Sequence, residues 1–269
     1  MVQVIPEKIR PPAELPRVSR ERLLATLGES LEGCNSTIIH GRAGTGKTML
    51  ATDFARRGDR RVAWYKLDAP DSELTVFLRH LCASIAEARP GFGERVLERV
   101  GVEEAGTDDV PLVVEYLVYE LLERSEPLLV VIDDLHLIYD AEWMVTFFRR
   151  WLPLLPREVH VMLLGRSLPP TPLWRMRSKQ TLCVLDETLL AFTLAEARRL
   201  FDSYGLPATS AEAAFKETRG RASALDRRAR SAGVAAETER LSASRTARPT
   251  ARLSLRLVKG GRKSSMGTA

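Results

Sequence analysis

The chain has 269 residues, of which 45% are hydrophobic and 28% charged, a composition typical of a globular protein with one large domain or two small ones. It contains no apolar run near the ~20 residues that span a bilayer, and its N-terminus lacks the apolar block of a signal peptide, so we expect a cytoplasmic protein with no membrane partner. The formal net charge is +5, but residues 226–269 hold 11 Lys and Arg against 3 Asp and Glu. The basic excess therefore belongs to the tail and does not predict a nucleic-acid-binding face on the rest of the chain.

Apolar runs separated by turn residues predict alternating helices and strands. Four prolines within residues 1–17 predict an extended lead-in, and Ser19 is expected to cap the helix that follows. The continuous apolar run LLVVID is typical of a strand buried on both faces of a parallel sheet. In chain order, the expected elements are helix 20–32, strand 37–40, helix 47–57, strand 61–67, helix 71–89, loop 90–109, helix 111–124, strand 128–133, helix 141–152, strand 159–164, strand 181–185, helix 193–205 and helix 210–218.

Strands that alternate with helices predict an α/β fold, here a P-loop NTPase three-layer sandwich with a mainly parallel five-stranded sheet, followed by the start of a helical domain. We expect a lead-in over 1–17, the NTPase domain over 18–188 and the beginning of a helical subdomain over 189–225. The composition then changes, because the last 44 residues have no aromatic side chain and are rich in Arg, Ser and Ala. Low hydrophobicity with high net charge predicts disorder for 226–269, with a nucleic-acid-binding arm or a non-native segment as alternatives.

The sequence GRAGTGKT at 41–48 matches the GxxxxGK[ST] pattern of a phosphate-binding loop. Glycines at this spacing let the backbone curl so that successive N–H groups face the phosphates, and the following helix adds its positive N-terminal end. Lys47 supplies a cation for the β- and γ-phosphates, and the Thr48 hydroxyl is a Mg²⁺ ligand. We therefore predict that the chain binds Mg-ATP. The loop residues expected to contact the nucleotide are Gly41, Ala43, Gly44, Thr45, Gly46, Lys47, Thr48 and Met49.

Acidic and basic side chains follow the two buried strands downstream of this loop. Asp133 ends the run LLVVID, where its carboxylate is expected to hold Mg²⁺, and Asp134 is expected to position or deprotonate the attacking water. Arg166 follows the next buried strand, a position beside the γ-phosphate in this topology. We therefore expect Lys47, Asp134 and Arg166 to be catalytic, with Thr48 and Asp133 holding the metal.

Several stretches besides GRAGTGKTML give the sequence a family resemblance. They are KIRPP and PRVSRERLL within 8–24, VAWYKLDAPDSELTVFLRHL at 62–81, and the segment from IDDLHLI to LLGRSLPPTPLWRMR at 132–177. Together they resemble the nucleotide-binding domain of the large ATP-dependent bacterial transcription regulators related to the maltose-regulon activator, a LuxR-type group within the signal-transducing STAND NTPases. The similarity continues weakly through TRGRASAL, where Arg221 stands in place of the family's usual Trp. Gly165 replaces the common Ser before the sensor Arg.

The resemblance implies a signalling module in which ATP holds one state and hydrolysis or release permits another. It also implies that Val18 and Arg20 line the adenine pocket, and that family members continue with winged-helix, sensor-arm and DNA-binding domains. These domains do not follow residue 225, so we hypothesise a truncation or frameshift there and expect no sequence-specific DNA binding by the chain itself. Self-association, or binding of a partner protein, would involve the helical subdomain.

Two other functions fit the same loop. A P-loop small-molecule kinase would need a lid with arginines, for which Arg175 and Arg177 are the candidates, and a truncated remnant would bind nucleotide without turnover. A GTPase is disfavoured because the chain has no [NT]KxD motif, and an ABC-type ATPase because it has no LSGGQ-like signature. The leading interpretation, a signalling NTPase, predicts weak ATPase activity.

Overall fold

The computed structural model describes residues 3–99, 105–170, 173 and 182–246. Its centre is a five-stranded sheet with the order β2-β3-β4-β1-β5, in which neighbouring strands are parallel. This arrangement confirms the predicted α/β fold. The strands are β1 Ser36–His40, β2 Arg61–Lys66, β3 Leu128–Asp133, β4 Val159–Gly165 and β5 Leu182–Leu185.

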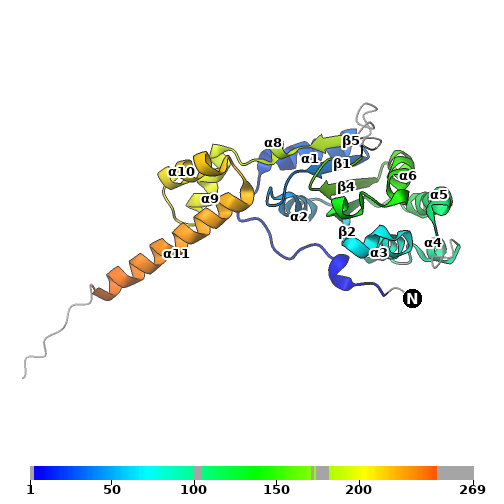
Figure 1. Ribbon diagram of the computed structural model, residues 1–269, viewed down its shortest axis with the longest axis horizontal. Helices are drawn as coiled ribbons and strands as arrows, with labels where there is room; N and C mark the ends of the chain where they lie inside the picture. Colours follow the sequence, from blue (N-terminus) through cyan, green and yellow to red (C-terminus); the bar gives the residue numbers. More distant parts are fainter. Residues whose placement is uncertain (1–2, 100–104, 171–172, 174–181, 247–269) are drawn as a thin grey trace, which may run out of the picture.

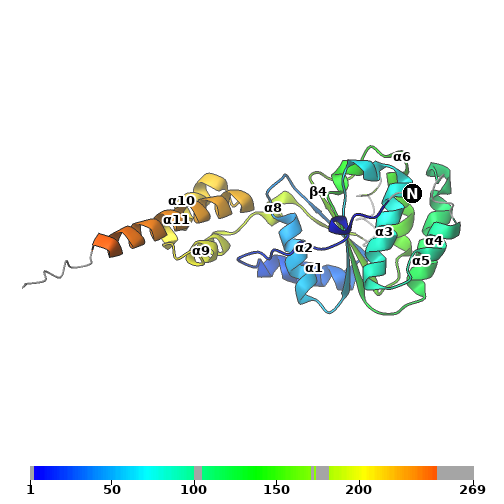
Figure 2. The ribbon, with the colours of Figure 1, turned by 90° about the horizontal axis from the view of Figure 1, so that it is seen from below.

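Helices cover both faces of this sheet. The α-helices of the described residues are α1 Glu21–Gly33, α2 Lys47–Arg57, α3 Leu74–Ala88, α4 Glu94–Arg99, α5 Val110–Leu122, α6 Glu142–Trp151, α8 Glu187–Leu190, α9 Leu194–Asp202, α10 Ala208–Thr218 and α11 Ala222–Thr246. Figure 2 shows α1 and α2 on one face and α3, α5 and α6 on the other, so the sheet is the middle of three layers. Helices α9, α10 and α11 form a smaller unit that lies beyond α8, away from the sheet (Figure 1).

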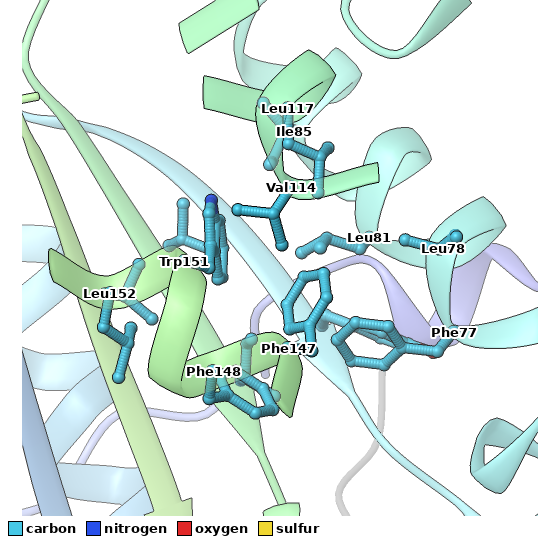
Figure 3. Packing of buried hydrophobic residues seen from close by; sticks show 14 of the residues in the cluster. Phe77, Leu78, Leu81, Ile85, Val114, Leu117, Phe147, Phe148, Trp151 and Leu152 are labelled. Atoms are coloured by element: carbon cyan, nitrogen blue, oxygen red, sulfur yellow. The ribbon is translucent and has the colours of Figure 1, made fainter. Parts of the chain in front are cut away.

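The larger core is aromatic and lies between the sheet and the layer of α3, α5 and α6 (Figure 3). Phe77 of α3 packs edge-on against Phe147 of α6, with ring centroids 5.3 Å apart, and Phe147 contacts Trp151 at the same distance. The apolar run of β3 supplies this core and the smaller one under α1 and α2, because alternate side chains enter opposite faces. The continuous hydrophobicity of β3 thus follows from burial on both sides.

A buried polar network joins α1, β1 and β4 on the smaller-core side. The hydroxyls of Ser30 and Thr37 share a hydrogen bond, and Thr37 Oγ1 lies 2.8 Å from Nε2 of His160, which is 2% exposed. Nδ1 of the same ring lies 3.1 Å from the carbonyl oxygen of Cys34. Burial lowers the pKa of His160 to about 4, so the imidazole is neutral at pH 7.

We expect this histidine to make the protein less stable in acid. In the unfolded chain His160 takes up a proton near pH 6.5, whereas in the folded chain it does so only near 4, so the unfolded state binds more protons between these values. The free energy of unfolding should therefore fall by up to about 3 kcal/mol between pH 6.5 and pH 4 on account of this residue. Urea denaturation of the wild type and of His160→Gln, which does not titrate, measures the difference. Parallel pH dependence in the two proteins would contradict this assignment.

The first part of the segment for which disorder was predicted, as far as Thr246, is helical in the structure. Helix α11 begins at Ala222, and Leu225 and Ala229 are 0% exposed in a cluster with side chains of α9 and α10. Apolar contacts with residues distant in sequence thus order the start of a segment whose own composition is poor in apolar side chains. The remaining part of the predicted tail, 247–269, lies outside the described residues.

Two local expectations are also corrected by long-range contacts. Ser19 does not cap α1, since its hydroxyl accepts a hydrogen bond of 2.6 Å from Arg57. The predicted loop 90–109 contains α4, because the buried carboxylate of Glu120 accepts the backbone N–H of Gly93 at the start of that helix.

Candidate nucleotide-binding site

The glycine-rich loop joins β1 to α2, as the motif requires. Gly44 and Gly46 have φ values of 81° and 82°, the left-handed region that favours glycine, and Gly46 is the N-cap of α2. This curl brings the loop to the end of α2 where the first backbone N–H groups have no partner within the helix. The backbone N–H of Gly41 donates to the carbonyl of Gly165 at 3.2 Å, which fixes the loop against the end of β4.

Lys47 folds back over its own loop. Its Nζ donates to the carbonyl oxygens of Gly41 and Arg42, at 2.6 Å and 3.2 Å, and the residue is 8% exposed. Burial lowers its pKa, against the attraction of Asp133 and Asp134. The ammonium group is therefore held at the loop by weak carbonyl acceptors that a phosphate anion could replace.

Thr48 and Asp133 meet although they are 85 residues apart. The Thr48 hydroxyl donates to Oδ2 of Asp133 at 2.9 Å, and Oδ1 accepts the backbone N–H of Asp134 at the same distance. Asp133 is 1% exposed, and burial, with the nearby charge of Asp134, raises the pKa of Asp133 to about 6. A desolvated carboxylate beside a hydroxyl oxygen is a donor set that suits Mg²⁺, since a cation would offset the cost of the buried charge. These residues thus fit the metal that the motif implies.

Asp134 and Arg166 lie at the same edge of the sheet. Asp134 has a φ of 60°, and its side chain is 30% exposed at the start of the short 3₁₀ helix Leu135–Ile138. Arg166 is exposed immediately after β4. Its positive charge helps to lower the pKa of Lys47, so the two cations lie close enough to repel each other. The structure therefore brings together all three side chains that the sequence suggested as catalytic.

The glycine at position 165, just before Arg166, has a local explanation. A Cβ at this position would lie 2.7 Å from the hydroxyl of Tyr139. That hydroxyl donates to the carbonyl of Ser167 at 2.9 Å and so holds the segment that carries Arg166. Glycine leaves room for the tyrosine, which performs the positioning.

A cavity of about 540 Å³ lies beside the loop. Its walls come from the lead-in, the loop, α9 and α11, and the residues are Glu14, Leu15, Pro16, Arg17, Val18, Arg20, Gly44, Gly46, Met49, Phe192, Leu200, Ala222, Ser223, Asp226 and Arg230. Val18 and Arg20 were expected from the sequence to line an adenine pocket, and Gly44, Gly46 and Met49 to contact the nucleotide. Phe192, Leu200 and the α11 residues were not, because nothing local in the sequence shows that the helical unit folds back onto the loop.

Arg20 lies beside this cavity and links the segments around it by hydrogen bonds. Its guanidinium donates to the carbonyls of Thr45, Gly46 and Leu190, at 3.2, 2.6 and 2.8 Å. Burial lowers its pKa to about 10, which leaves it charged at neutral pH. Its hydrogen bonds go to backbone carbonyls on both sides of the cavity, so the side chain joins the loop to the end of α8.

The start of α11 docks directly on the loop. The N–H of Ser223 donates to the carbonyl of Gly44 at 2.9 Å, and Arg221 donates to the carbonyl of Ala43 at 2.6 Å. A Cβ on Gly44 would lie 2.2 Å from the Ser223 hydroxyl, so the glycine is needed for this contact as well as for its backbone angle. Arg175 and Arg177, the suggested kinase lid, lie outside the described residues.

A parallel sheet with a GxxxxGKT loop after β1 and a buried acid at the end of β3, the next strand but one in the sheet, defines the protein as a P-loop NTPase. A family model described as an AAA ATPase domain matches residues 18–164. Since this is more than half of the chain, the protein belongs to the AAA ATPase domain family. The described residues contain no helix that is long and apolar enough to cross a membrane.

Solved structures share this fold at low sequence identity. A STAND protein with a tetratricopeptide repeat sensor from Pyrococcus horikoshii is 18% identical with a TM-score of 0.56, over 78% of this chain and 30% of that one. The present chain therefore spans about a third of that protein. A Walker-type ATPase of Pyrococcus abyssi (12% identity, TM-score 0.47, 86% and 77% covered) and the Orc1 protein of Aeropyrum pernix in complex with DNA (20%, 0.48, 85% and 62%) are also similar.

Proposed function

We propose that this chain is the Mg-ATP-binding switch module of a STAND-type transcription regulator related to the maltose-regulon activator. The observation that carries the proposal is the hydrogen bond between Thr48 and Asp133, which unites the phosphate loop with the acidic end of β3. A loop alone would bind phosphate. A loop joined to a buried carboxylate has the oxygen ligands that Mg²⁺ needs next to a nucleoside triphosphate.

The phosphates are bound by the loop and the base by the adjoining cavity in this proposal. Backbone N–H groups from Ala43 to Met49 surround the phosphates, and Lys47 turns from the carbonyls of the loop to the β- and γ-phosphate oxygens. The adenine lies in the cavity between Val18, Met49 and Phe192, whose apolar surfaces suit a flat aromatic ring. Arg20 keeps the two walls of that cavity in place.

Hydrolysis at this site is the transfer of the γ-phosphoryl group of ATP to water. The water oxygen bonds to the γ-phosphorus while the bond to the β–γ bridging oxygen breaks, and its electrons stay with ADP. Asp134 accepts the proton from the water, and Lys47 and Arg166 stabilise the charge on the phosphoryl oxygens. Mg²⁺ held by Thr48 and Asp133 would supply further neutralisation of phosphate charge. ATP and water yield ADP, phosphate and a proton.

The switch itself would involve the unit of α9, α10 and α11. Two hydrogen bonds hold the start of α11 on the loop, from Ser223 and Arg221 to the loop carbonyls. A ligand that changes the conformation of the loop therefore strengthens or weakens the contact with this unit. We assign the surface of the same unit to the binding of a partner protein or a second copy. In the proposed class of protein, the switch controls transcription, and the protein acts in the cytoplasm.

Transfer of labelled γ-phosphate tests the proposal against the kinase alternative. With γ-³²P-ATP we expect the label to appear only as inorganic phosphate, whether or not sugars, nucleosides or amino acids are added as acceptors. A labelled small-molecule product would favour a kinase. ATP binding without any phosphate release would favour the nucleotide-binding remnant.

A further inference from the structure

His136 is a partly buried residue whose two ring nitrogens are themselves buried and have no hydrogen-bond partner among the described residues. It lies in the 3₁₀ helix Leu135–Ile138, three residues after Asp133, and its side chain is 13% exposed. Leaving a buried polar atom without a partner destabilises a fold, and an apolar side chain here would avoid that cost. The cost indicates that a partner arrives in another state of the protein.

The surroundings of the ring identify that state. Nδ1 of His136 lies 3.9 Å from Oδ1 of Asp134, which is too long for a hydrogen bond but close enough for a small movement to form one. Burial lowers the pKa of His136, and the charges of Arg166 and Lys47 lower it further, whereas Asp134 raises it. The ring therefore lies near the side chains that we expect to act on the phosphates. At neutral pH it has one donor and one acceptor nitrogen.

We propose that His136 is a positioning residue for ATP hydrolysis, which closes on Asp134 when Mg-ATP is bound so that Nδ1–H donates to the Asp134 carboxylate. This inference rests on the proposed function. The hydrogen bond leaves the second carboxylate oxygen free to accept the proton of the attacking water. A donor on the following 3₁₀ helix would fix the direction of that carboxylate.

Substitutions of the ring separate positioning from packing. His136→Asn retains an N–H near the place of Nδ1, His136→Gln retains one near the place of Nε2, and His136→Leu has neither. We expect His136→Leu and His136→Gln to lower kcat by about 10- to 100-fold and His136→Asn by much less, with the ATP dissociation constant within about threefold of the wild type in all three. Equal losses in the Asn and Gln variants, or a kcat unchanged in the Leu variant, would overturn the inference.

A second measurement keeps the inference testable if the wild type turns over too slowly to assay. In ¹⁵N-histidine-labelled protein, the Mg complex of the non-hydrolysable analogue AMPPNP should shift the Nδ1 resonance of His136, and Asp134→Ala, which removes the acceptor, should abolish that shift. An unchanged resonance would contradict the role of His136 while leaving ATP binding intact. Failure of the wild type to bind AMPPNP would instead contradict the proposed function, and the inference with it.

Discussion

Replacing Asp133 with Asn is expected to abolish Mg²⁺-dependent ATP hydrolysis, with a loss of at least about 100-fold in kcat. The change removes one negative charge and leaves the shape of the side chain almost unaltered. The amide oxygen can accept the N–H of Asp134 while the amide NH2 donates to the Thr48 hydroxyl oxygen, so the contact between the loop and β3 persists. The metal loses its anionic ligand. Steady-state phosphate release over a range of Mg²⁺ concentrations measures the effect.

The same substitution should not weaken the fold. Burial raises the pKa of Asp133 to about 6, so the ionised carboxylate is less stable in the folded protein than in the unfolded chain at neutral pH. A neutral amide removes that penalty, and the unfolding temperature without Mg²⁺ should be equal to that of the wild type or higher. Asp140→Asn, the same change at an exposed carboxylate in the neighbouring turn, is the matched control and should hydrolyse ATP normally. Normal turnover by Asp133→Asn would exclude the assigned role.

The sheet could be predicted closely because its strands are marked by local sequence. The run LLVVID is β3 from its first residue to its last, and the helix over 47–57 has the predicted bounds. Thr193 caps α9 as its sequence indicates, since its hydroxyl accepts the N–H of Glu196 at 3.2 Å. In these places the determining contacts lie within a few residues of one another, so a single segment contains the whole signal.

Expectations were wrong where a side chain bonds to a distant partner. Asp71 was expected at the start of a helix, but both of its carboxylate oxygens accept from Lys8, and α3 begins only at Leu74. The start of α11 is ordered by contacts with α9 and α10, which composition does not reveal. Pattern and composition describe a segment by itself, whereas these outcomes depend on which segments the fold brings together.

The candidate site likewise contains parts that the sequence predicts and parts that it does not. Spacing and topology predict where the phosphate loop, Asp133 and Arg166 lie, because the ends of parallel strands meet at one edge of the sheet. The far wall of the cavity, with Phe192 and Leu200, and the docking of Ser223 on Gly44 could not be predicted. Those contacts join residues more than 140 positions apart, and no motif marks either partner. His136 lies within the motif recognised in the sequence. Only the structure shows that its ring nitrogens are buried without a hydrogen-bond partner in the described part of the chain, which singles it out from the other residues of that motif.

Binding of Mg-ATP by the wild type and by Lys47→Ala tests the central claim most directly. Titration calorimetry should give a dissociation constant about 10- to 100-fold weaker for the variant, since one charge-assisted phosphate contact of about 1.5–3 kcal/mol is lost. Lys216→Ala, which removes an exposed lysine on α10, should bind as the wild type does. Equal affinity in the wild type and Lys47→Ala, or no binding by the wild type, would contradict a nucleotide site built on this loop.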